Sequence, residues 1–279
     1  MHEVASSPEL RAATDAARQR GAGVGFVPTM GALHAGHRSL LAAARAENDL
    51  VVASVFVNPL QFGPSEDLAA YPRDRGADLA VLAAEGADLA FLPPDEEMWP
   101  VPPDVRLAVG SLAQRLEGLV RPGHLDGVAT VVAKLLHLVG PSRAYFGQKD
   151  AQQLAVVRRM VADLAFPNQI VACPTVREPD GLAVSSRNAY LSPDERRRVT
   201  ALFRALRAGQ AVFEAGERDP AAVEAAARDL LEGAPGVAPD YVALVDPVTF
   251  EPVKQAEPGQ VLATAARVGR ARLIDNVIL

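Results

Sequence analysis

Residues 23–58, GVGFVPTMGALHAGHRSLLAAARAENDLVVASVFVN, contain two apolar runs separated by a helical pattern. The first run, 23–29, has the length of a strand, and the helical pattern extends from about His37 to Ala46. The second run, 49–58, is almost continuously apolar, as in strands that are buried on both faces. A strand, a helix and a strand in this order predict a crossover connection within a parallel sheet.

The same alternation of strands and helices continues to about residue 176. The Pro-rich stretch 92–104 interrupts it and predicts a long irregular loop. We therefore predict an α/β fold in which a Rossmann-like, doubly wound parallel sheet domain, with helices on both faces, occupies residues 1–175. Its further elements are expected to be helices at 73–85, 127–140 and 151–164 and strands at 87–93, 143–148 and 168–176.

After this point the pattern changes to helices followed by strands, which predicts a smaller α+β C-terminal domain at 176–279. Its first helix, 191–216, has a clear start, with Ser192 as N-cap, Pro193 at the first helical position and Glu195 at the third. The other elements expected here are a helix at 219–233 and strands at 241–246, 260–269 and 271–279.

The composition is that of an ordinary globular protein, since 49% of the 279 residues are hydrophobic and 22% are charged. The net charge of −6 argues against binding to nucleic acid. A single cysteine, Cys173, excludes an intramolecular disulfide and a multi-cysteine zinc site, and its apolar neighbours predict a buried strand thiol. No apolar run reaches the roughly 18 residues of a membrane span, and the N-terminal residues lack a signal-peptide pattern. We therefore expect no membrane partner and a cytoplasmic location.

His34, Gly36 and His37 lie between the first strand and the next helix, at the edge of the sheet where this fold class binds ligands. Main-chain N–H groups at a helix N-terminus attract phosphate oxygens, a glycine allows close approach, and imidazoles donate hydrogen bonds to developing charge. The H-x-x-H spacing also suits a metal pair, but the remaining histidines offer no further paired ligands. The motif therefore favours a phosphate site, with an incidental pair of histidines as the alternative.

Polar residues also follow two of the other predicted strands. Asn58 and Gln61 come at the end of the second strand, although Asn before Pro is also a common start of a turn. Lys149 can neutralise phosphate charge, while Asp150 can cap the next helix and Gln153 lies one turn into that helix. These side chains are expected at the same edge of the sheet as the histidines.

Ser185, Ser186 and Arg187 follow a glycine-containing turn, in a loop between the two predicted domains. Two hydroxyls and a guanidinium suit the clamping of β- and γ-phosphates. A triplet of this kind has little specificity by itself. Its position after the three other polar segments makes it part of a predicted nucleotide site.

Five segments together resemble the pantoate–β-alanine ligase (pantothenate synthetase) family, of the HxGH nucleotidyltransferase superfamily: PTMGALHAGH, FVNPLQF, RPGHLDGV, YFGQKDAQQ and VREPDGLAVSSRN. They cover most of residues 22–191 in the family's order, and the C-terminal third is similar mainly in length and pattern. The resemblance implies ATP-dependent condensation of (R)-pantoate with β-alanine through a pantoyl adenylate, with release of pyrophosphate and AMP. It also implies ATP as substrate, Mg²⁺, a homodimer and a place in coenzyme A biosynthesis.

The resemblance implies roles for individual residues, with His34, His37 and Lys149 as the catalytic ones. The implied ATP contacts are Met30, Gly31, His34, Gly36, His37, Gly147, Lys149, Asp150, Val176, Val184, Ser185, Ser186 and Arg187. The implied pantoate or β-alanine contacts are Pro28, Met30, Asn58, Gln61, Arg121, His124 and Gln153. Mg²⁺ is expected mainly on ATP oxygens. Asp78 is a loosely implied protein ligand, and the favoured interpretation of Asp78 is a carboxylate on the helix surface. Gln148 stands where some members carry Glu, and it is assigned no role.

The family also implies that residues 176–279 act as a lid, with a hinge at 174–178, because an acyl adenylate must be protected from water. Two other functions are open at this point. A nucleotidyltransferase or a tRNA-charging enzyme can use the same H-x-G-H motif, although a basic tRNA-binding surface and an anticodon domain are not visible. A non-catalytic nucleotide-binding module is disfavoured because His34, His37, Lys149 and Arg187 are all intact.

Overall fold

A parallel strand pair is present where residues 23–58 predict it. The computed structural model describes residues 1–64 and 66–279. Strands β2 (Val24–Thr29) and β3 (Leu50–Val55) pair in parallel over their full lengths, and α2 (Ala35–Glu47) connects them. Their carboxyl ends therefore lie at one edge of the sheet, where the loop before α2 and the loop after β3 begin.

The sheet belongs to a first unit, which comprises Met1–Gln148 and Val156–Cys173. Its other strands are β1 (His2–Val4), β4 (Leu89–Phe91), β5 (Arg143–Gly147) and β6 (Gln169–Cys173). Its helical elements are α1 (Ser7–Gln19), η1 (Pro59–Gln61), α3 (Arg75–Ala84), α4 (Asp95–Met98), η2 (Ser111–Gln114), α5 (Leu116–Val120) and α6 (His124–Val139), and η3 (Gln148–Asp150) and α7 (Ala151–Asp163) are shared with the second unit.

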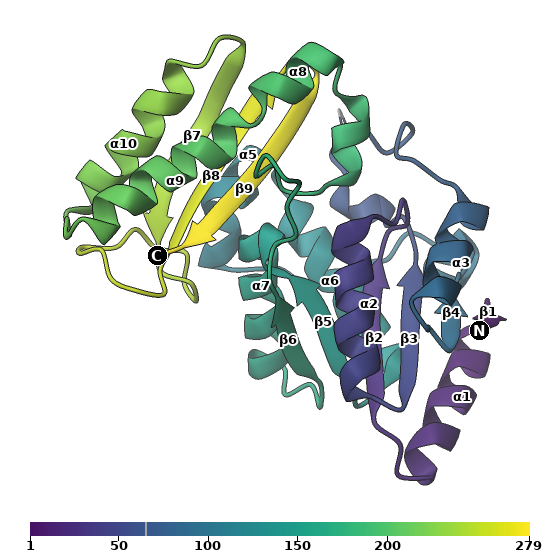
Figure 1. The fold of residues 1–279 in the computed structure, drawn as a ribbon. Coiled ribbons are helices and arrows are strands. Elements are labelled where there is room, and N and C mark those ends of the chain that lie inside the picture. Colours follow the sequence, from purple (N-terminus) through teal and green to yellow (C-terminus); the bar gives the residue numbers. More distant parts are fainter. Residues whose placement is uncertain (65) are drawn as a thin grey trace. The chain divides into compact units, whose positions relative to one another are not determined.

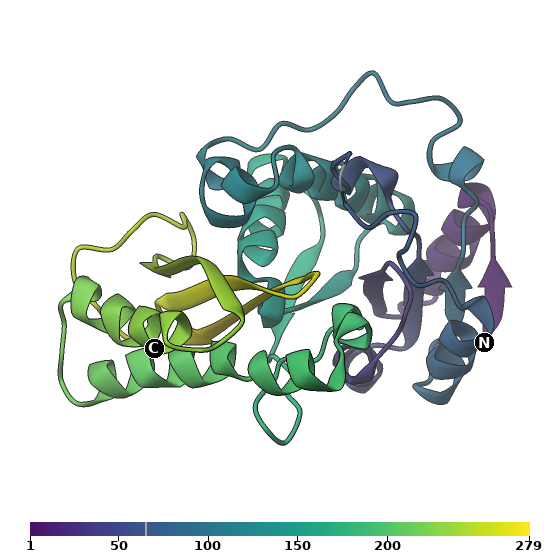
Figure 2. The same ribbon diagram turned by 90° about the horizontal axis from the view of Figure 1, so that it is seen from above.

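The strands follow the order β1-β4-β3-β2-β5-β6, and all pairs are parallel. Helices α2 and α3 cover one face of the sheet, and α1 and α6 cover the other (Figures 1 and 2). The chain reverses its direction across the sheet at β2 and β5, which is the switch point of a doubly wound fold. The prediction of a Rossmann-like sheet is therefore confirmed.

Apolar residues at helical spacing hold α2 against the sheet. Leu40, Leu41 and Ala44 are buried in one cluster with Val27 of β2 and Val51 of β3. Residues three and four apart lie on one face of a helix, so this face packs against the sheet. Because α2 follows β2 and β3 is parallel to β2, the first turn of α2 begins near the carboxyl ends of both strands. The histidine motif therefore lies at the start of a helix that is packed against the sheet.

The second unit comprises Lys149–Ala155 and Pro174–Leu279. Its antiparallel sheet has the order β7-β8-β9, with β7 at Val237–Val245, β8 at Val261–Val268 and β9 at Ala271–Ile278. Its helical elements are η4 (Ser186–Tyr190), α8 (Pro193–Arg198), α9 (Ala201–Glu214) and α10 (Pro220–Glu232).

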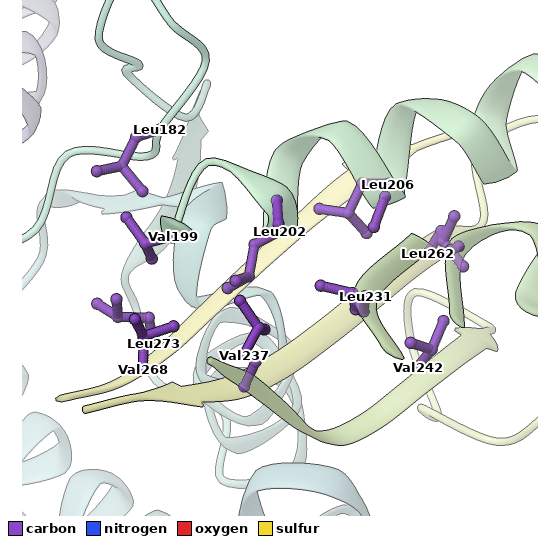
Figure 3. Close-up of a cluster of buried hydrophobic side chains, with 14 of the residues drawn as sticks. Leu182, Val199, Leu202, Leu206, Leu231, Val237, Val242, Leu262, Val268 and Leu273 are labelled. Atoms are coloured by element: carbon purple, nitrogen blue, oxygen red, sulfur yellow. The ribbon is translucent and has the colours of Figure 1, made fainter. Parts of the chain in front are cut away.

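Helices α9 and α10 pack side by side on one face of this antiparallel sheet (Figures 1 and 2). Figure 3 shows Leu202 and Leu206 of α9 and Leu231 of α10 in one cluster with Val242 and Leu262 of the strands. All five side chains are buried. The helices-then-strands pattern after residue 176 is therefore an α+β unit with its own core, as predicted.

Several details differ from the sequence-based expectation. The helix expected at 191–216 is interrupted after α8. At the break, Leu202 N bonds to Val199 O in a tighter turn and Thr200 donates its hydroxyl to Arg197 O (2.8 Å). The stretch 92–104, expected to be irregular throughout, contains the short helix α4. Strand β1 and helix α1 were not predicted. None of the helices in the described residues is long and apolar enough to cross a membrane.

Candidate active site

The two histidines of the motif are held by reciprocal hydrogen bonds at the start of α2. His34 is the N-cap residue, and its Nδ1 accepts a hydrogen bond from Gly36 N (3.1 Å). His34 N in turn donates to His37 Nδ1 (3.3 Å), and the two ring centroids are 4.1 Å apart. A Cβ atom on Gly36 would lie 2.9 Å from His34 Cε1, so a side chain at this position would displace the His34 ring.

These bonds assign the tautomer of both rings. A main-chain N–H can only donate, so Nδ1 of His34 and of His37 must be an unprotonated acceptor. In the neutral imidazole, the proton then resides on Nε2. Each ring therefore has Nε2–H as its hydrogen-bond donor, on the side of the ring opposite to the main-chain contact.

A buried carboxylate fixes the loop that leads into the motif. Asp78 on α3 is 3% exposed, and it accepts hydrogen bonds from Ala32 N (3.1 Å) and Leu33 N (2.8 Å). The loop is constrained, because Ala32 has φ +50°, a conformation that non-glycine residues rarely adopt. A Cβ atom on Gly31 would lie 2.7 Å from Asp78 Oδ2. The favoured interpretation of Asp78 as a carboxylate on the helix surface is therefore wrong.

Asn58 and Gln61 form one buried amide pair with Met30. Asn58 donates Nδ2 to Gln61 Oε1 and to Gly127 O (both 3.1 Å) and accepts at Oδ1 from Leu60 N (3.3 Å). Gln61 donates Nε2 to Met30 Sδ (3.0 Å). Strand β3 ends at Val55, three residues before Asn58, which is the N-cap of η1. The turn interpretation of Asn58 is therefore correct for its side chain, and its contacts orient Gln61.

His124 and Arg121 form a second polar group on the same unit. Arg121 binds Glu66 through Nε–Oε1 (2.9 Å) and Nη2–Oε2 (2.5 Å), and its Nη1 donates to His124 Nε2 (3.0 Å). His124 Nδ1 donates to Gln61 O (2.8 Å). Because arginine only donates and a carbonyl only accepts, His124 is neutral with its proton on Nδ1.

The pKa of His124 agrees with this assignment. Burial of the imidazole and the neighbouring Arg121 charge lower the pKa to about 4. The ring is therefore a fixed neutral link between Arg121 and the main chain of Gln61.

Two cavities of the first unit are lined in part by predicted residues. One of about 560 Å³ lies at the ends of β3 and β4, and its lining includes Met30 and Asp78. The other, of about 310 Å³, has His124 in its lining. Pro28 lies half-buried within β2, and Gly147 ends β5 with open space where its side chain would be. Volumes of this size suit small ligands.

The remaining predicted residues belong to the second unit. Lys149 and Asp150 lie just before α7, with Lys149 Nζ 3.5 Å from Asp150 Oδ1, and Gln153 is in the first turn of α7. Val184 N donates to Val176 O (3.0 Å). The predicted residues Ser185, Ser186 and Arg187 lie at the start of η4, where Ser185 Oγ accepts from Arg187 N (3.3 Å).

Each unit thus gathers part of the predicted set. The first contains the histidine motif with the residues Met30, Asn58, Gln61, Asp78, Arg121 and His124, and the second contains Lys149 with the serine–arginine loop. The supporting residues Thr29 and Glu66 were not predicted. Thr29 Oγ1 donates to Ser54 O (2.7 Å) and accepts from Gly31 N (3.2 Å). Ser54 lies 25 residues from Thr29 and Arg121 lies 55 residues from Glu66, so no local pattern marks these contacts.

The described residues contain no group of three or more His, Cys, Asp or Glu side chains that could hold a metal ion. Cys173 is buried on β6, as predicted, and burial followed by the Glu47 charge raises the pKa of its thiol. A thiol with a raised pKa is a poor nucleophile and a poor metal ligand.

Comparison with known proteins identifies the family. The family model of pantoate-beta-alanine ligase matches residues 2–278. The chain belongs to the pantoate–β-alanine ligase family. A pantothenate synthetase of Acidobacterium capsulatum is 56% identical over 274 residues, which are 98% of this chain and 90% of that protein.

Solved structures of the family have the same fold. The crystal structure of pantothenate synthetase from Thermus thermophilus matches with a TM-score of 0.94 and 52% identity over 99% of both chains. The pantoate-beta-alanine ligase from Francisella tularensis, complexed with beta-gamma ATP and beta-alanine, matches with a TM-score of 0.81 and 31% identity over 100% of this chain and 97% of that chain. Both chains are matched almost completely, so the resemblance of the C-terminal third extends to its structure.

Proposed function

We propose that this protein is an ATP-dependent ligase that condenses (R)-pantoate with β-alanine to pantothenate through a pantoyl adenylate. The observation that carries the proposal is the His34–His37 pair, whose Nδ1 atoms are occupied by the main chain so that both Nε2–H groups are donors. Family membership supports the overall reaction. The Francisella tularensis enzyme, complexed with beta-gamma ATP and beta-alanine, supports these two molecules as substrates.

In the first step, a carboxylate oxygen of pantoate attacks the α-phosphorus of ATP. The new O–P bond forms as the bond to the β-phosphate bridging oxygen breaks, and pyrophosphate leaves with that electron pair. Negative charge grows on the α-phosphate oxygens, and we assign the Nε2–H donors of His34 and His37 to that charge. Donors already fixed by the fold stabilise a transition state without reorganising.

Lys149, Ser185, Ser186 and Arg187 are assigned to the β- and γ-phosphates and to the departing pyrophosphate. A lysine ammonium supplies a point charge, while an arginine guanidinium binds two oxygens in a fixed geometry. The assigned ATP contacts also include Met30, Gly31, Gly36, Gly147, Asp150, Val176 and Val184. Support comes from the matching family segments and from the placement of Lys149 and the loop within one unit.

Gln61 and Gln153 are assigned to the hydroxyl and carboxylate groups of pantoate. A site that reads hydroxyls needs paired donors and acceptors, and an amide provides both. The amide of Gln61 is oriented by Asn58, and its main chain is held by His124. Pro28, Met30, Arg121 and His124 complete the assigned pantoate and β-alanine contacts.

In the second step, the amine of β-alanine attacks the acyl carbon of the adenylate. The C–N bond forms, the C–O bond to AMP breaks, AMP leaves with the electron pair, and the amine proton is lost to solvent. Acyl adenylates hydrolyse easily, so the site must exclude water between the steps. We propose that residues 1–175 bind ATP and pantoate and that residues 176–279 act as the lid.

Magnesium is proposed to enter as part of the substrate, bound to ATP oxygens, because Mg²⁺ takes few protein ligands and keeps several waters. Asp78 is the implied candidate for a protein contact to this ion, but both of its oxygens already accept main-chain hydrogen bonds, so we expect it to hold the loop rather than to bind the ion. We further propose a homodimer in the cytoplasm that uses small-molecule substrates and no nucleic acid.

The test is incubation with ATP, Mg²⁺, (R)-pantoate and β-alanine, with AMP, pyrophosphate and pantothenate measured separately. The proposal requires AMP and pantothenate in equal amounts and dependence of both on β-alanine. Pyrophosphate without AMP indicates a nucleotidyltransferase. No turnover with any combination indicates a nucleotide-binding module without catalysis.

A further inference from the structure

A buried ion pair connects β9 to the turn that precedes the serine–arginine loop of the second unit. Asp275 on β9 is 4% exposed, and it binds Arg177 through Nη1–Oδ2 (2.7 Å) and Nη2–Oδ1 (3.0 Å). Arg177 also donates Nη1 to Gly181 O (3.0 Å) and Nη2 to Asn276 O (2.9 Å). Its guanidinium lies 4.2 Å above the ring of Phe203. Every one of these contacts lies within the second unit.

The neighbour of Asp275 on the same strand holds the proposed catalytic lysine. Asn276 is 5% exposed, and its Nδ2 donates to Lys149 O (2.8 Å). Asn276 N also donates to Asp275 Oδ1 (2.8 Å), so the strand, the ion pair and the lysine main chain form one chain of contacts. A lysine side chain is long and flexible, and fixing its main chain restricts where the ammonium can reach.

The other end of the network shapes the turn before Ser185. Arg177 and Ala183 form an antiparallel bridge, and Glu178 N donates to Leu182 O (2.8 Å). Gly181 has φ +91°, and a Cβ atom there would lie 2.0 Å from Phe203 Cδ1. The turn therefore has a single close-fitting geometry, stacked on the ring that also lies beneath Arg177.

We propose that Arg177, Asp275 and Asn276 are positioning residues that hold Lys149 and the Ser185–Arg187 loop as one phosphate-binding frame. The inference rests on the proposed function, which assigns these two segments to the ATP phosphates. Neither Asp275 nor Asn276 is assigned to contact substrate. Their effect is transmitted through the main chain of Lys149 and through Arg177.

A buried ion pair is a weak source of stability, because well-packed apolar residues of the same volume are often as stable. The ion pair instead fixes orientation, because a bidentate arginine–carboxylate contact holds both side chains in one plane. Burial raises the pKa of the Asp275 carboxyl above its usual value, although the Arg177 contact opposes the rise. The pair is thus better suited to hold a geometry than to add to stability.

Asn276→Ala removes the donor to Lys149 O and leaves the ion pair in place. We expect pantoate-dependent exchange between pyrophosphate and ATP to slow by about tenfold or more, because small misplacements of a catalytic group have large effects on rate. The β-alanine step, followed by chasing the enzyme-bound adenylate, should change much less. The matched control is Thr264→Val on β8, since Thr264 is buried and donates Oγ1 to Tyr241 O (2.9 Å) within the same sheet.

The double variant with Lys149→Ala separates positioning from general destabilisation. If Asn276 acts through Lys149, Asn276→Ala produces no further slowing of the exchange in the Lys149→Ala background. The inference is overturned if the losses of exchange rate in the two single variants multiply in the double variant. It is also overturned if Thr264→Val loses as much exchange rate as Asn276→Ala. A normal exchange rate in folded Asn276→Ala overturns it as well. If Asn276→Ala does not fold, Asn276→Thr replaces it, because threonine suits a strand and its shorter side chain does not reach Lys149 O. The same exchange measurements on Asn276→Thr then test the inference.

The control for the underlying function is the wild-type protein. Absence of AMP from the wild type refutes the proposed function. Normal AMP formation by the wild type, slow exchange in Lys149→Ala and unchanged exchange in Asn276→Ala refute the positioning network alone.

Discussion

Replacing Asp78 with asparagine should separate a role in loop positioning from a role in metal binding. The carboxylate accepts one hydrogen bond on each oxygen, from Ala32 N and Leu33 N. Asparagine has nearly the same shape but keeps only one acceptor oxygen, and it turns an amide N–H toward the second main-chain N–H. One of the two contacts to the loop is therefore lost, and two donors face each other.

The magnitude follows from the kind of bond that is lost. A hydrogen bond to a charged group contributes about 1.5–3 kcal/mol, and an unpaired buried donor costs a similar amount, so we expect the free energy of unfolding to fall by about 2–3 kcal/mol. The constrained Ala32 conformation, φ +50°, then has less to hold it. Because the loop leads directly into His34, we expect kcat to fall by about tenfold to a hundredfold.

The assay is denaturant unfolding together with initial rates of AMP formation at a series of Mg²⁺ concentrations. Asp74→Asn is the matched control, because Asp74 caps the same helix by accepting from Ala77 N (2.9 Å). Asparagine caps a helix about as well as aspartate, so this control removes a charge from α3 without losing a contact. It should be close to wild type in both measurements.

Two results would refute the reasoning. If Asp78→Asn is as stable as Asp74→Asn and has normal kcat, the carboxylate does not hold the loop. If the variant is stable but needs a much higher Mg²⁺ concentration for half-maximal rate, Asp78 is a metal ligand. We expect lower stability, lower kcat and an unchanged Mg²⁺ requirement.

Substitutions at three other residues test the site. His37→Asn keeps an acceptor in place of Nδ1 but loses the Nε2–H donor, so kcat should fall about a hundredfold. His37→Gln has a longer side chain that ends in an N–H donor, and it should retain more activity. Equal rates for the two variants would remove the Nε2–H donor from the mechanism. Lys149→Ala should slow pyrophosphate–ATP exchange more than amide formation, and the reverse order would contradict its assignment. Burial and the Arg121 charge lower the pKa of His124 from 6.5 to about 4, so between these pH values the unfolded chain binds a proton that the folded chain does not. The free energy of unfolding should therefore fall by up to about 3 kcal/mol as the pH drops from 6.5 to 4, and His124→Asn, measured by denaturant unfolding, should lack this part of the loss.

The features that the sequence predicts well are local. Residues 23–58 predict β2, α2 and β3 because apolar spacing within about ten residues distinguishes a helix from a buried strand. The same spacing places the H-x-G-H motif at a helix start, which the structure confirms with His34 as N-cap. The strand predicted at 49–58 begins one residue before β3 and ends three residues after it. It ends too late because Phe56 and Val57 are apolar although they lie beyond the last ladder pair.

The features that the sequence did not predict depend on distant partners. Asp78 lies 45 residues from Leu33, and Arg177 lies 98 residues from Asp275, so no periodicity connects either pair. Helix α1 is a different case, because Pro8 and Glu9 in its first turn are ordinary N-terminal signals that a sequence can show. The break between α8 and α9 contains no glycine or proline, so neither of the usual sequence signals marks it.

The carboxylates of Asp78 and Asp275 address the same physical problem in separate units. A loop that binds phosphate must direct its donors outward and hold them rigidly, yet an acidic side chain beside a phosphate repels it. Asp78 avoids this by accepting main-chain N–H groups of its loop, and Asp275 does so by pairing with Arg177. In both places the carboxylate is buried and its partners lie in its own unit, so its effect is to fix the conformation of the loop. Neutralising either one should therefore weaken catalysis by loosening a loop, even though removal of a negative charge by itself favours phosphate binding.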